Sequence, residues 1–342
     1  MHKKIYLSVI LGILFFVSCK DKKQYYEESG TVFHTLYTIK YEAPHILTDK
    51  IDAELQKFNL SLNPFNPNSI IAKVNNNEAV EVDEWFTEVF NKSMEVSRNS
   101  DGVFDITCAP LVNLWGFGFN KKDSVTPTMI DSLKTFVGYQ KVHLEGKKIV
   151  KDDPRLLLNC SAIAKGYSCD VIARLLEKEG VENYMVLIGG EVVVKGVNQN
   201  GVCWRTGINL PEDDPDGIKN NYDEIVQLCK KGAIATSGNY RNFYIKDGKK
   251  YAHTINPRTG YPAEQSVLSA TIVANDCMTA DAYATAFMAM GLEKARQMAD
   301  TLPEIEYYVI YADESGKHQI EFSKGMLQYL PKRKTMISSD NS

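Results

Sequence analysis

The stretch that most constrains the fold of this chain is Cys277–Gly291, in which Ala, Met and Phe dominate. That composition is typical of a buried helix. Asp281 nevertheless falls within its first turns, and Thr285 follows one helical turn later on the same face. Because an unpaired buried carboxylate costs several kcal/mol, Asp281 must have a partner.

Two kinds of partner for Asp281 fit the sequence. The first is a backbone amide at a helix start, or a nearby cationic side chain. The second is a bound divalent cation, for which Asp281 and Thr285 would both supply oxygen ligands. Spacing alone leaves both interpretations open.

The N-terminus predicts export. Lys3 and Lys4 precede an apolar run over 5–17, and the chain turns polar directly after Ser18-Cys19. This pattern predicts a signal peptide over residues 1–18 and a polar tether over 19–29. Residues 16–19 resemble a lipobox with Phe16 where Leu is usual, so we expect an exported lipoprotein anchored to the membrane through Cys19 and facing the periplasm. An ordinary secretory signal is the alternative.

Composition narrows the remaining classes. The 342-residue chain has a formal net charge of −4, which offers no electrostatic argument for nucleic-acid binding. No internal apolar run approaches the ~20 residues of a membrane span. Six cysteines follow Cys19 without any C-x-x-C pair. Export permits disulfides, but buried free thiols are the expected state of most of these cysteines.

The hydrophobic pattern predicts an α+β fold, because runs of strands alternate with helices around an antiparallel or mixed sheet. One domain is expected over residues 30–330, followed by a polar tail over 331–342. A helix beginning near Ala162 should be capped by Ser161 and end at Gly180. The expected strands include 31–40, 155–159, 184–188, 192–197, 204–209 and 268–274, and the expected helices include 47–60, 83–97, 277–291 and 293–300.

Four segments combine glycine with polar side chains, and each has two interpretations. In 101–118, Phe104 and Asp105 either face a heteroaromatic ligand or form a buried aromatic corner with Asp105 capping a turn. Segment 159–166 runs into a helix N-terminus that carries Lys165, which suits an anion or is an ordinary capped helix. Gly189-Gly190 allows close approach to a ligand or forms a bulge. His253 is a general base, a phosphate partner or a structural histidine.

Taken in order, the motifs resemble the ApbE family of exported flavin transferases. The resemblance runs from about residue 30 to 325 and rests on five segments: Asp101-Gly-Val-Phe-Asp-Ile-Thr with 110–118, Asn159–Asp170, Gly189-Gly190, 235–240 with 253–262, and Ala280-Asp-Ala-Tyr-Ala-Thr285. It implies an ApbE-like (T-fold-like) α+β fold of mixed or antiparallel sheets and packed helices in a single compact catalytic domain.

The resemblance also implies a Mg²⁺ site and an FAD site. The cation would be held by the Ala162 carbonyl, Asp281 and Thr285. His253 is our candidate for the group that accepts the hydroxyl proton. The isoalloxazine and adenosine contacts would fall on Phe33, Phe65, Val103, Phe104, Asp105, Asn159, Lys165 and Thr254.

Several positions depart from the family pattern. Phe33 stands where Met is usual, His34 where Gly is usual, and Phe65 where Tyr is usual. Asn159 replaces a frequent Asp, which weakens one expected polar contact to FAD, and Glu191 stands where Asp or Asn is typical. None of these changes removes an expected metal ligand.

The activity implied by the resemblance is transfer of FMN from FAD to a Thr or Ser hydroxyl of an acceptor protein, with release of AMP. The expected acceptor is a membrane-associated redox subunit. One alternative is a Mg²⁺-dependent FAD pyrophosphatase that uses water as the nucleophile, and another is a non-catalytic flavin-binding lipoprotein. A generic solute-binding lipoprotein is disfavoured, since the sequence has no boundary between two lobes.

Overall fold

The computed structural model describes residues 23–118, 125–212, 221–240, 243–246, 249–263 and 266–331, and the statements below concern those residues. The predicted signal peptide, Cys19 and residues 332–342 of the predicted tail lie outside them. In the described part of the chain, no helix is both long and apolar enough to cross a bilayer.

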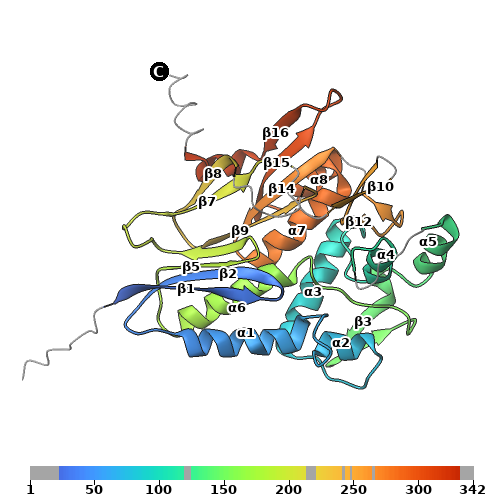
Figure 1. The fold of residues 1–342 in the computed structure, drawn as a ribbon, viewed down its shortest axis with the longest axis horizontal. Coiled ribbons are helices and arrows are strands. Elements are labelled where there is room, and N and C mark those ends of the chain that lie inside the picture. Colours follow the sequence, from blue (N-terminus) through green and yellow to red (C-terminus); the bar gives the residue numbers. More distant parts are fainter. Residues whose placement is uncertain are drawn as a thin grey trace, which may run out of the picture.

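An eight-stranded sheet forms the centre of the molecule (Figure 1). Every neighbouring pair in it is antiparallel, which confirms the α+β prediction. In spatial order the strands are β1 (Gln24–Val32), β2 (Thr35–Ala43), β5 (Tyr184–Ile188), β6 (Glu191–Lys195), β9 (Gly232–Gly238), β14 (Val267–Ala274), β15 (Ile305–Ala312) and β16 (His318–Phe322).

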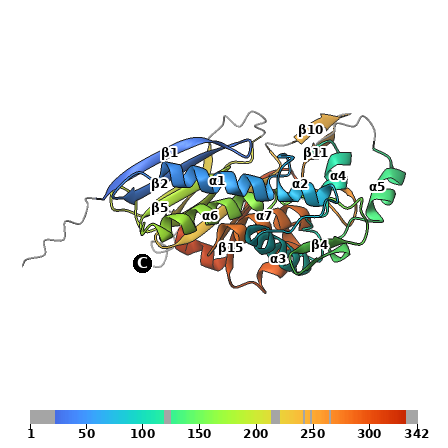
Figure 2. The ribbon, with the colours of Figure 1, turned by 90° about the horizontal axis from the view of Figure 1, so that it is seen from below.

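A layer of helices covers one face of this sheet (Figure 2). Their apolar sides, which include Phe58, Phe86, Tyr167 and Phe287, join the sheet in the main core. The predicted helix over 277–291 is confirmed as α7, and nearly all of it is buried. The layer consists of α1 (Thr48–Leu62), α3 (Glu84–Asn99), α6 (Ala164–Lys178), α7 (Cys277–Met290) and α8 (Leu292–Ala299).

The opposite face packs against a hairpin of β7 (Trp204–Asn209) and β8 (Tyr222–Leu228) and against the 3₁₀ helix η2 (Lys324–Tyr329). A disulfide joins Cys203 to Cys229, next to the ends of this hairpin. The other four described cysteines are buried thiols, as expected for most of them. The strands predicted over 192–197 and 204–209 are present as β6 and β7, but they are not sheet neighbours: β7 pairs with β8, and in the described chain an isolated bridge joins Val197 to Cys203.

Short elements gather at one end of the sheet, to the right in Figure 1. They supply loops around the site described below. They are α2 (Ile70–Asn75), α4 (Ala109–Leu114), α5 (Pro127–Lys134), η1 (Tyr139–Lys141), β3 (Val142–Glu145) with β4 (Lys148–Lys151), β10 (Phe243–Lys246) with β11 (Lys249–Ala252), and β12 (Ile255–Asn256) with β13 (Tyr261–Pro262).

Two further predictions were wrong at the N-terminal end. Strand β1 already begins at Gln24, so the tether expected over 19–29 does not extend through residues 24–29. The strand expected over 31–40 is interrupted by a two-residue turn at Phe33 and His34, whose φ angles are 51° and 60°. Such turns favour Asn-Gly or Asp-Gly, and Phe-His carries no such signal.

The strand expected over 155–159 is also absent, because this segment has no regular structure. Its apolar residues Leu156 and Leu158 are buried individually in the main core. The Asn159 N–H donates to the carbonyl of Ile106 at 2.7 Å, so the segment is held against the loop before α4. Burial alone produced the apolar pattern here, without a strand partner.

Candidate functional site

A cavity of about 480 Å³ lies where the starts of α6 and α7 meet β6 and β9. Eleven of the twelve residues that the sequence and the resemblance single out line it, and Phe33 is the exception. The eleven are Phe65, Val103, Phe104, Asp105, Asn159, Ala162, Lys165, His253, Thr254, Asp281 and Thr285.

Helix α7 supplies one wall of the cavity. Asp276 caps the helix by accepting from the Thr279 N–H at 2.8 Å, and this fixes the position of the next turns. Asp281 is only 3% exposed, and its Oδ2 accepts from the Gly166 N–H at 2.9 Å. The Thr285 hydroxyl lies 3.3 Å from the Ser237 hydroxyl of β9.

The sequence predicted that Asp281 needs a partner, and one such partner is a backbone amide at the start of α6. Among the described residues, only the Gly166 N–H donates a hydrogen bond to its carboxylate. Burial raises the pKa of Asp281, while the nearby Lys165 charge lowers it. Accepting this amide leaves Asp281 on the cavity wall, so the cation interpretation and the capping interpretation are compatible.

The start of α6 forms a second wall, and it does not begin as predicted. The residue before the helix is Ile163, which makes no side-chain cap, so the prediction that Ser161 caps the helix was wrong. The Ser161 N–H instead donates to Asn159 Oδ1 at 2.9 Å. A cap at Ser161 would have accepted a hydrogen bond from one of the free amides at the start of α6. Asp281, from a distant part of the chain, accepts from one of these amides instead, the Gly166 N–H.

Lys165 and Glu191 form an ion pair inside the cavity. Burial opposes the charge on Lys165, but the carboxylates of Glu191 and Asp281 outweigh that effect and raise its pKa. Glu191 is 2% exposed, and burial raises its pKa although Lys165 lowers it. Lys165, Glu191 and Asp281 therefore lie in one wall of the cavity. When all three are ionised, this wall carries two negative charges and one positive charge.

Gly189 and Gly190 lie directly before Glu191, with φ angles of 67° and 108°. A Cβ at Gly189 would lie 3.1 Å from Glu191 Oε2 and 3.1 Å from Lys165 Cδ. Glycine is therefore needed here both for the backbone conformation and for the room that the ion pair occupies. The structure shows a turn between β5 and β6 whose Gly189 lines the cavity.

Asp105 caps a turn, as one interpretation of its segment expected, and its place in the cavity wall is compatible with the other interpretation, contact with a ligand. Its carboxylate accepts from the Thr107 N–H at 2.7 Å and from the Tyr139 N–H at 2.8 Å, so it caps a turn and holds η1. It also lines the cavity beside Val103 and Phe104. Burial raises the pKa of Asp105 to about 6, against the hydrogen bonds, which lower it.

The loop that carries His253 closes the cavity from a further side. The His253 ring meets the edge of Phe117 at 6.4 Å between centroids. The loop is fixed to α4 because Trp115 Nε1–H donates to the Gly260 carbonyl at 2.8 Å. Phe65, which is 53% exposed, also lines the cavity.

Phe33 is the one expected flavin contact that does not line the cavity. Its ring lies in the turn between β1 and β2 and packs on Phe58 of α1, 5.1 Å between centroids. Its neighbour His34 instead meets the exposed ring of Phe65, 5.8 Å away.

Sequence reasoning missed Asp170 of α6. Its two carboxylate oxygens accept from the Cys277 N–H at 2.9 Å and from the Met278 N–H at 2.8 Å, which are the first amides of α7. It is buried in the interior of a helix, so the argument that singled out Asp281 would also have found it. Thr236, Ser237 and Tyr240 also line the cavity; they fall in segment 235–240 of the resemblance, but the sequence assigned them no role.

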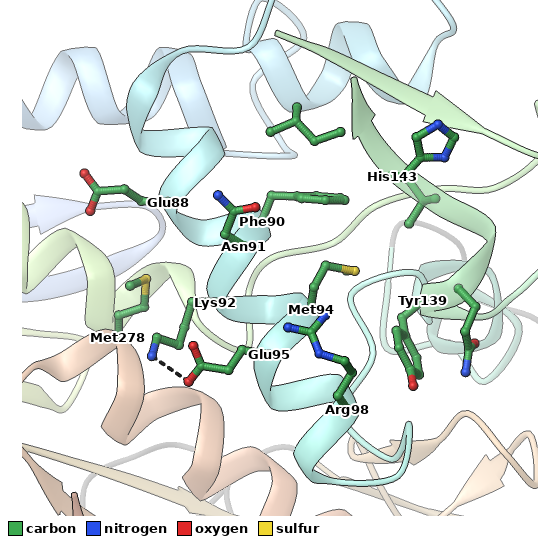
Figure 3. Close-up of a pocket in the computed structure, with 13 residues that line it drawn as sticks. Glu88, Phe90, Asn91, Lys92, Met94, Glu95, Arg98, Tyr139, His143 and Met278 are labelled. Carbon is green, nitrogen blue, oxygen red and sulfur yellow. Dashed lines mark hydrogen bonds and ion pairs between the residues drawn. The ribbon is translucent and has the colours of Figure 1, made fainter. Parts of the chain in front are cut away.

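A second, more open hollow of about 780 Å³ lies along α3, beside η1 and β3 (Figure 3). Lys92 and Glu95 pair with each other at its edge. None of the residues predicted for the site lines this hollow, so its larger volume does not make it the candidate site. Among the described residues, no group of three or more His, Cys, Asp and Glu side chains could hold a metal, so a cation would depend on hydroxyl or carbonyl oxygens as well.

Comparison with known proteins adds independent findings. A model of the ApbE family matches residues 33–309. The FAD:protein FMN transferase of Vibrio cholerae is 35% identical over 323 residues, which cover 91% of this chain and 95% of that protein. The FAD:protein FMN transferase of Escherichia coli K12 is 32% identical over 314 residues, which cover 85% and 88%.

Solved structures agree. The flavin transferase ApbE of Vibrio cholerae superposes with a TM-score of 0.81 at 34% identity, covering 90% of this chain and all of that one. The apo form of the flavinyl transferase ApbE of Pseudomonas stutzeri gives a TM-score of 0.79 at 26% identity, covering 90% and 97%.

Proposed function

Because this chain belongs to the ApbE family, we propose that it is a Mg²⁺-dependent flavin transferase that moves FMN from FAD to a Thr or Ser hydroxyl of an acceptor protein and releases AMP. The observation that carries the proposal is the meeting of Asp281, Thr285, Ala162 and Lys165 in one cavity with the aromatic residues of 103–118. Oxygen ligands for a cation, a positive charge for phosphate and apolar surface for a ring system are the three elements that FAD requires.

The residues present fit a hard cation. A buried carboxylate, a hydroxyl and a backbone carbonyl are all oxygen donors, which Mg²⁺ prefers. When Asp281 and Glu191 are both ionised, the wall carries one more negative than positive charge, which a pyrophosphate would meet unfavourably without a cation. Bound between Asp281, Thr285 and the Ala162 carbonyl, Mg²⁺ would supply charge neutralisation for the pyrophosphate and the departing AMP.

The remaining work falls to the chain itself. Phe65, Val103, Phe104, Asp105, Asn159 and Thr254 would hold the flavin and adenosine parts of FAD, with Lys165 near the phosphates. The acceptor hydroxyl oxygen forms a bond to the phosphorus on the FMN side, the bond from that phosphorus to the AMP oxygen breaks, and the hydroxyl proton passes to His253. Positioning and charge account for most of the catalysis in such a transfer.

Mass spectrometry tests the reaction. Candidate membrane-associated redox proteins are incubated with this protein, FAD and Mg²⁺, and we expect one Thr or Ser peptide to gain the mass of FMN while AMP appears. Omission of the acceptor is the control. Rapid release of FMN and AMP without an acceptor would favour the pyrophosphatase, and unchanged FAD throughout would favour a flavin-binding protein.

We propose that the protein is anchored to a membrane through a lipid on Cys19 and faces the periplasm. The support is the basic, apolar and Ser18-Cys19 pattern of the N-terminus, which lies outside the described residues. Mass spectrometry of the protein purified from membranes should find acyl mass on a peptide that begins at Cys19. An unmodified mature terminus at another residue would contradict this.

A further inference from the structure

Helices α6 and α7 cap each other. Asp281 of α7 accepts the Gly166 N–H at the start of α6, and Asp170 of α6 accepts the Cys277 and Met278 N–H groups at the start of α7. The first amides of a helix have no partners within it, so each helix completes the other. The two helices contact each other within the helical layer that covers one face of the sheet (Figure 2).

The spacing of the two helices is also set by Gly166. A Cβ there would lie 2.2 Å from the Cys277 carbonyl oxygen and 2.7 Å from Asp281 Cβ. The helices therefore leave no room for a side chain at this position, and the hydrogen bonds that Asp170 accepts hold the start of α7 there.

This junction lies directly behind the proposed cation site. Helix α6 carries Lys165 and follows Ala162, whereas α7 carries Asp281 and Thr285. A change in the position of one helix against the other would separate Asp281 and Thr285 from the Ala162 carbonyl. Asp170 does not itself line the cavity.

We propose that Asp170 is a positioning residue, which holds α7 against α6 so that the oxygens of Asp281, Thr285 and Ala162 face one cation. The inference rests on the proposed function. It differs from a purely stabilising role because α7 has a separate local cap, in which Asp276 accepts from the Thr279 N–H at 2.8 Å. Asp276 therefore provides a matched control on the same helix start.

The test measures Mg²⁺ binding to the intact protein by calorimetry, with no flavin present and at a temperature at which every variant is folded by circular dichroism. Asp170→Asn keeps one acceptor oxygen and places an NH₂ group against the second backbone N–H, so one of the two hydrogen bonds is lost. Because this loosens the start of α7, we expect Mg²⁺ affinity to fall about 10- to 100-fold. Asp276→Asn should leave the affinity within about twofold, since Asn caps helices as well as Asp does.

Asp170→Glu is the second variant, in case Asp170→Asn does not fold. It keeps the charge and both acceptor oxygens but adds one methylene, so it displaces α7 and should also weaken Mg²⁺ binding. Wild-type affinity in the folded Asp170 variants, with lower stability alone, would overturn the positioning role.

Two reference measurements separate this inference from the proposed function. Wild type should bind Mg²⁺, and Asp281→Ala should not. Failure of either overturns the cation assignment itself and the inference with it, whereas success of both with no effect at Asp170 overturns only the inference.

Discussion

Asp170 and Asp281 are buried aspartates that perform the same local task at the starts of two neighbouring helices. Asp170 uses both oxygens on the amides of α7 and has no access to the cavity, whereas Asp281 accepts one amide of α6 and lines the cavity wall. The difference teaches that a carboxylate in an apolar helix is not in itself a sign of chemistry. A carboxylate indicates a site, and not only a structural cap, when one of its oxygens accepts no hydrogen bond from the protein and the group lines a cavity.

The largest effect should come from Asp281→Ala. Loss of a charged cation ligand removes several kcal/mol of charge stabilisation, so we expect FMN transfer to fall about a thousandfold or more. The protein should stay folded, because only one hydrogen bond is lost and the cost of burying a charge disappears with it. Flavinylation of an acceptor, followed by mass spectrometry across a Mg²⁺ titration, is the measurement. Full activity in this variant would break the comparison, since both aspartates would then be structural caps.

His253→Ala tests the side of the cavity opposite in role to α7, where the proposed general base lies. If the cation acts at Asp281, proton transfer needs a separate group, and loss of a general base lowers the rate about 10²- to 10³-fold. The transfer rate should therefore fall much more than FAD affinity, which flavin fluorescence reports. An equal loss of rate and affinity would make His253 a ligand contact only.

Asp170→Ala should lower the free energy of unfolding more than Asp281→Ala does. It removes two hydrogen bonds and leaves two buried amides of α7 unsatisfied, which costs about 4 kcal/mol of unfolding free energy. Asp281→Ala should cost clearly less. Urea unfolding of both variants, with Asp276→Ala as the local-cap control at about 1 kcal/mol, decides the order. A larger loss at Asp281 than at Asp170 would reverse the roles we assign.

Asp105 is an intermediate case, since it accepts two amides like Asp170 and lines the cavity like Asp281. Its pKa is raised to about 6 by burial, so the folded protein holds the proton more tightly than the unfolded chain does. The resulting contribution to stability is full below about pH 4 and is lost as the pH rises through about 6, with a total of no more than about 3 kcal/mol.

The measurement is urea unfolding of wild type and Asp105→Asn between pH 4 and pH 7. Wild type should lose stability relative to the variant over this range, because Asn carries no charge at any pH. A difference between the two proteins that does not change with pH would show that Asp105 titrates normally.

The sequence predicted elements well where the signal was local. The helices predicted over 277–291 and 83–97 lie close to the bounds of α7 and α3. It failed where distant residues decide the structure. Ser161 was a reasonable cap by local rules, but the amide of Gly166 is satisfied by Asp281, 115 residues away. Phe33 and His34 form a turn that their residue types do not favour, and the paired strands around them impose it.

The candidate site was predictable as a set of residues but not as a geometry. Eleven of the twelve expected residues line one cavity because the family motifs mark them individually. Neither the Lys165–Glu191 ion pair nor the role of Asp170 could follow from spacing, because each joins residues from separate elements. Asp170 could still have been flagged as a buried carboxylate within α6 that needs a partner.

The reciprocal caps also have a consequence for the order in which the chain folds. Their hydrogen bonds span 107, 108 and 115 residues, so α6 remains incomplete until the chain has reached Asp281. Such long-range closure is slow compared with local helix formation. Helices α6 and α7 should therefore become protected from hydrogen exchange together and late. A nascent chain that ends before residue 277 would present an open junction where the finished protein has its proposed cation site.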